Sequence, residues 1–315
     1  MNAIEIKDLY KSYGKVHVLK GINLQVKQGS LFALLGPNGA GKTTIVRILA
    51  TLLRFNDGSA KIFGHDVIRE ADEVRRRVSL TGQFASVDDE LTGLENLILV
   101  ARLLGYSWAE AKIRAAELLQ AFGLEDAGKR QVKHYSGGMR RRLDIAATVV
   151  VSPDLLFLDE PTTGLDPRSR RTIWEVIHTL RATGTTVLLT TQYLEEADEL
   201  ADRIVIIDNG TIIADGAPGQ LKASVGSGIL RVRLHHAEQR AVAERIVGQT
   251  LGVATQLETD PAAFSAQVND PEQLTPVFTS LSQAKIPLAE FSLGQPSLDE
   301  VFLSLTGQPI IDKTK

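Results

Sequence analysis

The sequence predicts an α/β protein built on a mainly parallel sheet, and three patterns support this class. The run 155–158 is continuously apolar, which is typical of a parallel strand covered on both faces, and residues 185–189 repeat the pattern with two threonines at the start. The apolar run 31–35 leads through a glycine-rich loop into an amphipathic helix. The runs 204–208 and 211–214 flank Asn209-Gly210, a strong signal for a two-residue hairpin.

The elements beside the glycine-rich loop follow from local periodicity. Alternating apolar residues at positions 22, 24 and 26 predict a strand, and Gln28-Gly29 predicts the turn that ends it. After the loop, apolar residues at i, i+3, i+4 and i+7 predict a helix with one buried face: Ile45, Ile48, Leu49 and Leu52.

Residues 89–135 have helical periodicity throughout. Two capping boxes, Thr92-x-x-Glu95 and Ser107-x-x-Glu110, each open an apolar run, and glycines at 105 and 123 mark the helix ends. A further helix carries apolar residues on one face and leads into the run 155–158; these residues are Met139, Leu143, Ala146 and Val150. We therefore expect a helical subdomain at about 89–150 within an N-terminal domain of residues 1–224.

The remaining residues, 225–315, predict a separate small domain. Gly226-Ser227-Gly228 is typical of a linker, and a strand, a helix, two strands, a helix and a strand follow it. This order indicates a split βαβ, ferredoxin-like α+β domain.

Composition excludes several classes of protein. The 315 residues are 43% hydrophobic and 23% charged, which argues against a largely disordered chain. The 35 Lys+Arg and 38 Asp+Glu leave a net charge of −3, without the basic excess of a nucleic-acid binder, so we expect no nucleic-acid partner. The absence of cysteine rules out disulfides, thiolate metal sites and a cysteine nucleophile.

No apolar run approaches the ~18 residues that a membrane-spanning helix requires, and the densest, 145–151, stops far short. The first seven residues alternate apolar and charged side chains and lack the pattern of a signal peptide. We therefore expect a cytoplasmic chain that does not itself cross a membrane.

The glycine-rich loop carries the first chemical motif. Gly36-Pro37-Asn38-Gly39-Ala40-Gly41-Lys42-Thr43 fits G-x-x-x-x-G-K-[ST] and lies between a predicted strand and a predicted helix, as the phosphate loop requires. Glycines let successive N–H groups point at a β-phosphate, and the helix N-terminus adds positive charge. Lys42 is then expected to reach the β/γ oxygens and Thr43 to hold Mg²⁺. A plain glycine-rich turn would explain neither the lysine nor the threonine.

Two carboxylates end the apolar run 155–158. Asp159 is expected at the carboxyl edge of the sheet, beside the phosphate loop, where it binds the magnesium shell. Glu160 is expected to take a proton from the water that attacks the γ-phosphate. Adjacent carboxylates are often only a solvated strand end, but together with the loop they predict a phosphate-loop NTPase.

A third motif, Ser136-Gly137-Gly138, opens a predicted helix in which Arg140, Arg141 and Arg142 follow. Serine and glycine at a helix N-terminus predict a second anion site, with an ordinary serine N-cap as the alternative. The arginines are expected on a solvated or domain-contacting face.

Taken together, residues 1–220 resemble the nucleotide-binding subunit of an ABC transporter. The ordered motifs are the phosphate loop (Walker A), Gln83 in the Q-loop, the signature at 135–139, 155–160 (Walker B) and Gly164-Leu165-Asp166 (D-loop). The resemblance implies ATP and Mg²⁺ as ligands, a contact of Gln83 with the metal and γ-phosphate, and stacking of Tyr13 on adenine. It also adds Thr44 and Asp166 to the nucleotide-binding residues.

Two positions depart from the usual family pattern: Tyr135 stands where leucine is common, and Gln192 stands where the switch histidine is common. A glutamine amide can donate a hydrogen bond to a γ-phosphate but cannot take a proton near neutral pH. Both departures, with residues 294–302, resemble the daunorubicin-resistance (multidrug export) type. Within residues 294–302, Ser297-x-x-Glu300 also fits a capping box, so the alternative for this segment is a plain terminal helix.

The resemblance implies a mechanism and partners. Two copies pack head to tail, each ATP lies between the phosphate loop of one and the signature of the other, and hydrolysis reopens the dimer. The partner is an ABC-2-type permease on a separate chain, which places this chain at the cytoplasmic face of the membrane as a peripheral subunit. The cargo stays open between drugs, lipids and glycans.

Two other functions compete with this interpretation. A soluble ABC-type ATPase acting on ribosomes or DNA generally carries two modules or long coiled coils, and the sequence shows one module and no sustained heptads. A regulatory protein that binds ATP without hydrolysis would not need Glu160.

Overall fold

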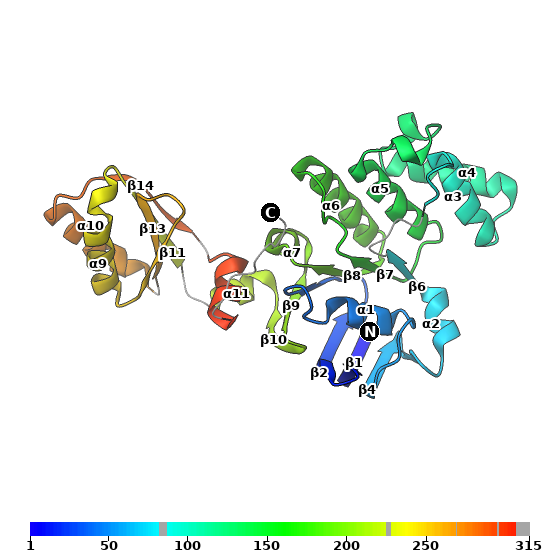
Figure 1. The fold of residues 1–315 in the computed structure, drawn as a ribbon, viewed down its shortest axis with the longest axis horizontal. Helices are drawn as coiled ribbons and strands as arrows, with labels where there is room; N and C mark the ends of the chain where they lie inside the picture. Colours follow the sequence, from blue (N-terminus) through cyan, green and yellow to red (C-terminus); the bar gives the residue numbers. More distant parts are fainter. Residues whose placement is uncertain (82–86, 225–227, 269, 295, 307–315) are drawn as a thin grey trace. The chain divides into compact units, whose positions relative to one another are not determined.

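A six-stranded sheet organises the N-terminal part of the chain in the computed structural model (Figure 1). Its order is β10-β9-β3-β8-β7-β6, parallel except for the β9–β10 hairpin. The strands are β3 (Leu31–Leu35), β6 (Val78–Thr81), β7 (Leu155–Asp159), β8 (Thr186–Thr191), β9 (Arg203–Asp208) and β10 (Thr211–Gly216). Every residue of β3, β7 and β8 is buried, so these strands are covered on both faces as their continuous apolar runs predict.

The structure describes residues 1–81, 87–224, 228–268, 270–294 and 296–306. It divides into two compact units, Met1–Ala217 and a second that begins at Pro218. Among the described residues, no helix combines the length and apolar character needed to span a membrane.

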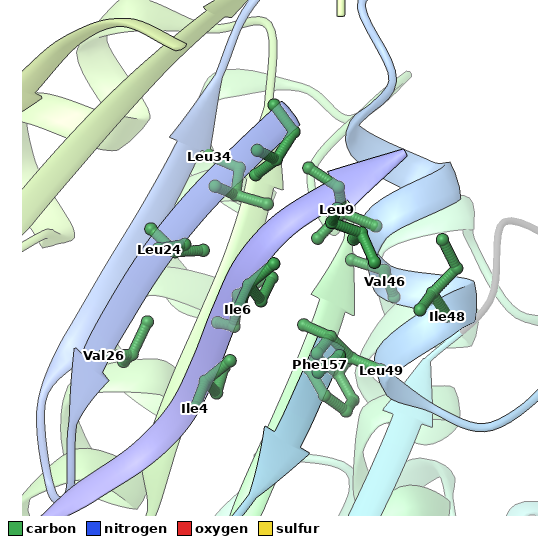
Figure 2. Close-up of a cluster of buried hydrophobic side chains, with 14 of the residues drawn as sticks. Ile4, Ile6, Leu9, Leu24, Val26, Leu34, Val46, Ile48, Leu49 and Phe157 are labelled. Carbon is green, nitrogen blue, oxygen red and sulfur yellow. The ribbon is translucent and has the colours of Figure 1, made fainter. Parts of the chain in front are cut away.

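An antiparallel sheet packs over the first helix of the N-terminal unit. Its strands are β1 (Asn2–Tyr13), β2 (Val16–Lys27), β4 (Asp57–Ile62) and β5 (His65–Asp66), and the helix is α1 (Lys42–Leu49). Figure 2 shows side chains of β1 and β2 gathered with those of α1, β3 and β7 in one cluster: Ile4, Ile6, Leu9, Leu24, Val26, Leu34, Val46, Ile48, Leu49 and Phe157. Each such side chain contributes roughly 1.5 to 3 kcal/mol when fully buried, so this core fixes α1 against the sheet.

One residue of the predicted α1 stripe is not in that core. Ile45, Ile48 and Leu49 are buried, but α1 ends at Leu49 and Leu52 is 66% exposed. Thr51 adopts a positive φ of 62°, which turns the chain out of the helix before Leu52. The prediction for Leu52 was therefore wrong.

The helical insertion forms as its capping boxes predict. Thr92 caps α3 (Gly93–Leu103), and Ser107 caps α4 (Trp108–Ala121); in both, the third helical residue is a glutamate whose side chain bonds back to the cap backbone. Gly105 and Gly123 follow these helices with φ of 96° and 59°. Helices α3, α4 and α5 (Gly137–Thr148) gather on one side of the parallel sheet in Figure 1, and the antiparallel sheet lies on the other.

The other helices of the N-terminal unit are short connections or cover the parallel sheet. They are α2 (Ala71–Arg77), α6 (Pro167–Ala182) and α7 (Leu194–Leu200), with 3₁₀ turns at Glu125–Ala127 and Val132–His134. Asn209 and Gly210 have φ of 47° and 79°, which is the turn geometry that their hairpin signal predicts.

The second unit has a four-stranded antiparallel sheet of order β12-β13-β11-β14. The chain runs β11 (Gly228–Leu234), α9 (Arg240–Leu251), β12 (Thr255–Leu257), β13 (Ala263–Val268), α10 (Leu274–Gln283) and β14 (Leu288–Gly294), with 3₁₀ turns at Ala237–Gln239 and Pro271–Gln273. This is the predicted ferredoxin-like order. The sheet and its helices α9 and α10 share a separate apolar core. Helix α8 (Pro218–Ala223) packs on α11 (Leu298–Thr306), which the Ser297–Glu300 capping box opens.

Candidate functional site

The phosphate loop joins β3 to α1 at the carboxyl edge of the parallel sheet. Gly41 has φ of 108°, and a Cβ on Gly36 would lie 2.1 Å from the carbonyl oxygen of Ile207, so neither position accepts a side chain. The Gly36 N–H donates to the carbonyl of Thr191 at the end of β8 (3.4 Å). The first turn of α1 holds no acidic residue and no side-chain cap, so the positive end of this helix faces the loop uncompensated.

Lys42 is the charged group inside this loop. Its Nζ donates to the carbonyls of Gly36 (2.7 Å) and Pro37 (3.1 Å) and lies 3.7 Å from Oε1 of Glu160. The side chain is 4% exposed. Burial lowers the pKa of Lys42 from its ordinary value, while the charges of Glu160 and Asp159 oppose the shift. The ammonium is therefore held at the loop, next to the carboxylates, with little water around it.

Thr43 and Asp159 meet across the loop and the sheet. The Thr43 hydroxyl donates to Oδ1 of Asp159 (3.2 Å), and the hydroxyl of Thr190 donates to the same oxygen. Asp159 is 4% exposed. Hydroxyl and carboxylate oxygens are the ligands that Mg²⁺ prefers, and nucleotide-bound Mg²⁺ needs only one or two protein oxygens besides phosphate. Within the residues described, no group of three or more acidic or histidine side chains forms a metal cage.

Glu160 follows β7 with a strained backbone. Its φ is 48°, the left-handed region that non-glycine residues enter at a cost of roughly 1 to 3 kcal/mol. Its N–H donates to both the carbonyl and the hydroxyl of Thr190, each at 3.1 Å. The hydroxyl of Thr163 donates to Oε2 at 3.3 Å. The side chain is 13% exposed and lines a cavity.

The signature motif begins α5 close to Glu160. Ser136 caps this helix by accepting from the Met139 N–H (3.3 Å), and a Cβ on Gly138 would lie 2.4 Å from Oγ of Ser169. A cavity of about 520 Å³ lies between the start of α5 and the loop that follows Glu160. It is lined by Gly137, Arg140, Arg141, Asp144, Glu160, Thr163, Gly164 and Leu165.

The three signature arginines contact protein groups rather than only solvent. Arg140 pairs with Asp89, and Arg142 donates to the carbonyls of Phe122 (2.8 Å) and Gly123 (3.1 Å). Arg141 donates to the carbonyls of Pro161 and Asp159. These arginines are therefore partly buried and bonded within the N-terminal unit, and they do not form a purely solvated face.

The other predicted site residues lie around this centre. Tyr13 ends β1 half-exposed, with Nζ of Lys11 at 4.8 Å above its ring. Gln192 follows β8 and is 8% exposed. Asp166 caps α6 by accepting from the N–H groups of Arg168 and Ser169, and bonds from Ser169 lead the causes that lower its pKa. Gln83 lies outside the described residues.

Interactions between side chains thus bring together four of the predicted residues: Lys42, Thr43, Asp159 and Glu160. Sequence reasoning missed Thr190, which donates to the Asp159 carboxylate and accepts from the Glu160 N–H, and it missed Glu196 on α7. The signal for Thr190 was weak, because a threonine in a buried strand is ordinary. Glu196 is only 1% exposed, and its Oε1 accepts from Thr162 (2.8 Å) and Trp174 (3.3 Å).

Glu196 is expected to make stability depend on pH. Burial raises its pKa above the ordinary 4.5, against opposing bonds from Thr191, Thr162 and Trp174. The folded chain then binds more protons than the unfolded chain, so this contribution to stability falls as pH rises above about 4.5. The Glu196→Gln variant has no titrating group at this position. Its free energy of unfolding should therefore rise relative to that of the wild type as pH rises.

Urea unfolding of both chains between pH 4 and 8 measures this difference. Glu195→Gln is the control, because Glu195 is an exposed neighbour on the same helix. A difference between Glu196→Gln and the wild type that stays constant with pH would contradict the assignment.

Family models match both parts of the chain. A family model described as "ABC transporter" matches residues 19–163, and one described as "ATP-binding protein DrrA1-3-like, C-terminal domain" matches residues 216–306. The daunorubicin/doxorubicin resistance ATP-binding protein DrrA of Streptomyces peucetius is 58% identical over 99% of this chain and 94% of its own length. The Nod factor export ATP-binding protein I of Cupriavidus pinatubonensis is 36% identical over 98% and 92%.

Solved structures match about two thirds of the chain. An ATP-binding subunit of an ABC transporter aligns with a TM-score of 0.63 and 32% identity, over 70% of this chain and 92% of that one. A dimeric ATP-binding cassette in a post-hydrolysis state with ADP and Pi aligns with a TM-score of 0.62 and 27% identity, over 68% and 98%.

Proposed function

Because this chain belongs to the ABC transporter family of ATP-binding subunits and is the ATPase of an exporter, we propose that two copies close head to tail around ATP and thereby drive a separate permease. The observation that carries the proposal is the convergence of Lys42, Thr43, Asp159 and Glu160 at one edge of the sheet. Dimeric packing of a related cassette supports the two-copy arrangement.

In this proposal the residues that bind nucleotide come from both halves of the dimer. The loop N–H groups and the start of α1 hold the β-phosphate, Lys42 neutralises the β/γ oxygens, and Tyr13 stacks on adenine. The full set is Tyr13, Gly36, Pro37, Asn38, Gly39, Ala40, Gly41, Lys42, Thr43 and Thr44 of one copy with Ser136, Gly137, Gly138 and Asp166 of the other. Asp166 anchors the start of α6, so its loop faces the second copy in a fixed conformation.

Thr43, Asp159 and Gln83 are proposed to hold Mg²⁺, which when bound neutralises charge on the phosphates. The bond between Thr43 and Asp159 supports this, because it already aligns the two oxygens. Glu160 takes a proton from the attacking water as the water's oxygen bonds to the γ-phosphorus and the bond to the β-phosphate oxygen breaks. Gln192 donates a hydrogen bond to the γ-phosphate or to that water.

We propose that residues 1–224 form the domain that binds ATP, with a helical subdomain at about 89–150. Residues 225–315 form an accessory domain. All the proposed ATP contacts lie before residue 193. The second compact unit begins at Pro218 and so includes helix α8, which precedes the proposed domain boundary at residue 225. The partner is proposed to be an ABC-2-type permease, with this chain at the cytoplasmic face of the membrane. Given the 58% identity to a daunorubicin/doxorubicin resistance protein, the cargo is proposed to be an anthracycline-type drug.

Doxorubicin uptake into inverted membrane vesicles tests this function. Vesicles from cells depleted of this chain are expected to regain ATP-dependent uptake when the purified wild-type chain is added, and not when Glu160→Gln is added. Absence of ATP-dependent uptake with the wild-type chain would contradict the proposed cargo. Sedimentation of the chain with ribosomes or DNA instead of vesicles would favour the soluble alternative.

Gln192→Ala is expected to slow hydrolysis. It removes one hydrogen bond to a charged partner, worth roughly 1.5 to 3 kcal/mol, which is about a ten- to hundredfold loss of turnover. ADP binding should change little. Gln192→His should recover part of the rate, because imidazole donates the same bond, and it should add a titration near pH 6.5.

ATPase rates of the purified chain with both substitutions across pH 6 to 9 measure this. A turnover of Gln192→Ala equal to that of the wild type would remove Gln192 from the site and leave it only as the residue that follows β8.

A further inference from the structure

Arg141 joins the signature helix to the backbone around Glu160. From α5, its Nε donates to the carbonyl of Pro161 (2.9 Å) and its Nη2 donates to the carbonyl of Asp159 (3.2 Å). These two carbonyls belong to the residues immediately before and after Glu160. A planar guanidinium can fix both at once, which a lysine ammonium on a flexible stem cannot do in the same geometry.

The backbone of Glu160 needs such support because its conformation is strained. A non-glycine residue with φ of 48° keeps that conformation only where its surroundings hold it. On one side Thr190 of β8 binds the Glu160 N–H with both its carbonyl and its hydroxyl. On the other side Arg141 binds the two flanking carbonyls, so β8 and α5 together determine where the carboxylate points.

We propose that Arg141 is a positioning residue for hydrolysis, which orients the Glu160 carboxylate from helix α5. The inference rests on the proposed function, in which Glu160 is the base and Ser136-Gly137-Gly138 face the ATP of the second copy. Arg141 lies about one turn into the helix that those residues open. Contact of α5 with the second ATP therefore also sets the position of the base in its own copy.

The neighbouring arginines of α5 do not share this geometry. Arg140 pairs with Asp89, and Arg142 donates to the carbonyls of Phe122 and Gly123 at the end of α4. Arg142 is thus a matched control, because it makes the same kind of contact from the next position and reaches the helical subdomain instead of Glu160.

Steady-state kinetics of the full-length chain test the proposal. Arg141→Ala is expected to lower kcat about tenfold or more, while KM for ATP and the affinity for ADP stay within about twofold. Arg141→Lys should be intermediate. Arg142→Lys should change kcat by less than about threefold. If Arg141→Ala does not fold, the kcat of Arg141→Lys is compared with that of Arg142→Lys. Equal kcat values for these two variants would overturn the proposal.

A double-mutant cycle with Glu160→Gln separates positioning from a merely structural effect. If Arg141 acts through the Glu160 carboxylate, Arg141→Ala should not slow the residual hydrolysis of Glu160→Gln any further. An equal fold-loss in both backgrounds would mean that Arg141 acts independently, and the proposal would fail.

Dimer formation by the wild-type chain in ATP and Mg²⁺ is measured in the same samples. A wild type that hydrolyses ATP without dimerising would refute the proposed head-to-tail function and with it the link to the second ATP. In that case non-additivity between Arg141 and Glu160 would still support positioning of the base. A dimeric wild type with unaltered Arg141 variants would refute the inference alone.

Discussion

Glu160→Gln should abolish almost all ATP turnover while ATP stays bound. The amide cannot accept the proton of the attacking water, and a positioned general base contributes typically about 10²- to 10⁴-fold in rate. The substitution keeps the size of the side chain, and the amide oxygen still accepts a bond from Thr163. The backbone bonds from Glu160 to Thr190 do not involve the side chain and should remain. Hydrolysis no longer reopens the dimer, so the closed form accumulates.

Phosphate release measures ATP turnover, and light scattering in ATP and Mg²⁺ measures the amount of dimer. The expected outcome is a dimer that persists in ATP and returns to the wild-type mass after exchange into ADP. Glu195→Gln, on the exposed face of α7, should match the wild type in both measurements. Turnover near wild type in Glu160→Gln would remove Glu160 as the base.

Lys42→Ala should weaken ATP binding about a hundredfold and remove turnover with it. The ammonium is only 4% exposed and lies at the loop that the phosphates occupy in the proposed complex, where loss of one charged contact costs roughly 3 kcal/mol. Removal also leaves the carbonyls of Gly36 and Pro37 without this donor. The loop should therefore lose local order, while the apolar core beneath α1 stays intact.

Calorimetric titration with ATP measures this affinity, and circular dichroism checks the fold. Lys27→Ala is the control, since Lys27 ends β2 on the exposed side. A folded Lys42→Ala chain with unchanged ATP affinity would contradict the assignment of the phosphate loop.

The parts of this molecule that follow from local chemistry were predictable. The apolar run of β7 and the similar pattern of β8 identified them as covered strands, and the capping boxes at Thr92 and Ser107 located the starts of helices α3 and α4. Asn209-Gly210 identified its hairpin because both residues tolerate positive φ. The phosphate loop and Asp159-Glu160 met because the carboxyl ends of parallel strands share one edge of a sheet.

The parts that depend on contacts between distant segments were not predictable. Arg141 and Arg142 are identical side chains at adjacent positions, and only the tertiary fold directs one to the carbonyls that flank Glu160 and the other to the end of α4. Glu196 lies in a run of acids that looks like a solvated helix face, and its burial depends on Thr162 and Trp174 from other elements. The stripe that included Leu52 failed because a positive φ at Thr51 ends the helix one turn early.

Site-specific crosslinking tests the central claim, that ATP lies between the phosphate loop of one copy and the signature of the other. The chain has no cysteine, so introduced thiols are the only ones. Asn38 and Gly137 are exposed, and a Cβ on Gly137 meets nothing closer than 4.0 Å. In the Glu160→Gln background, Asn38→Cys and Gly137→Cys are placed on separately tagged copies.

A short bifunctional thiol reagent is then added with ATP or with ADP. Head-to-tail closure predicts a 38-to-137 crosslink between differently tagged copies in the mixture with ATP, and none with ADP or with either copy alone. A dimer that forms in ATP but yields no such product, or that joins like positions to each other, would contradict the account.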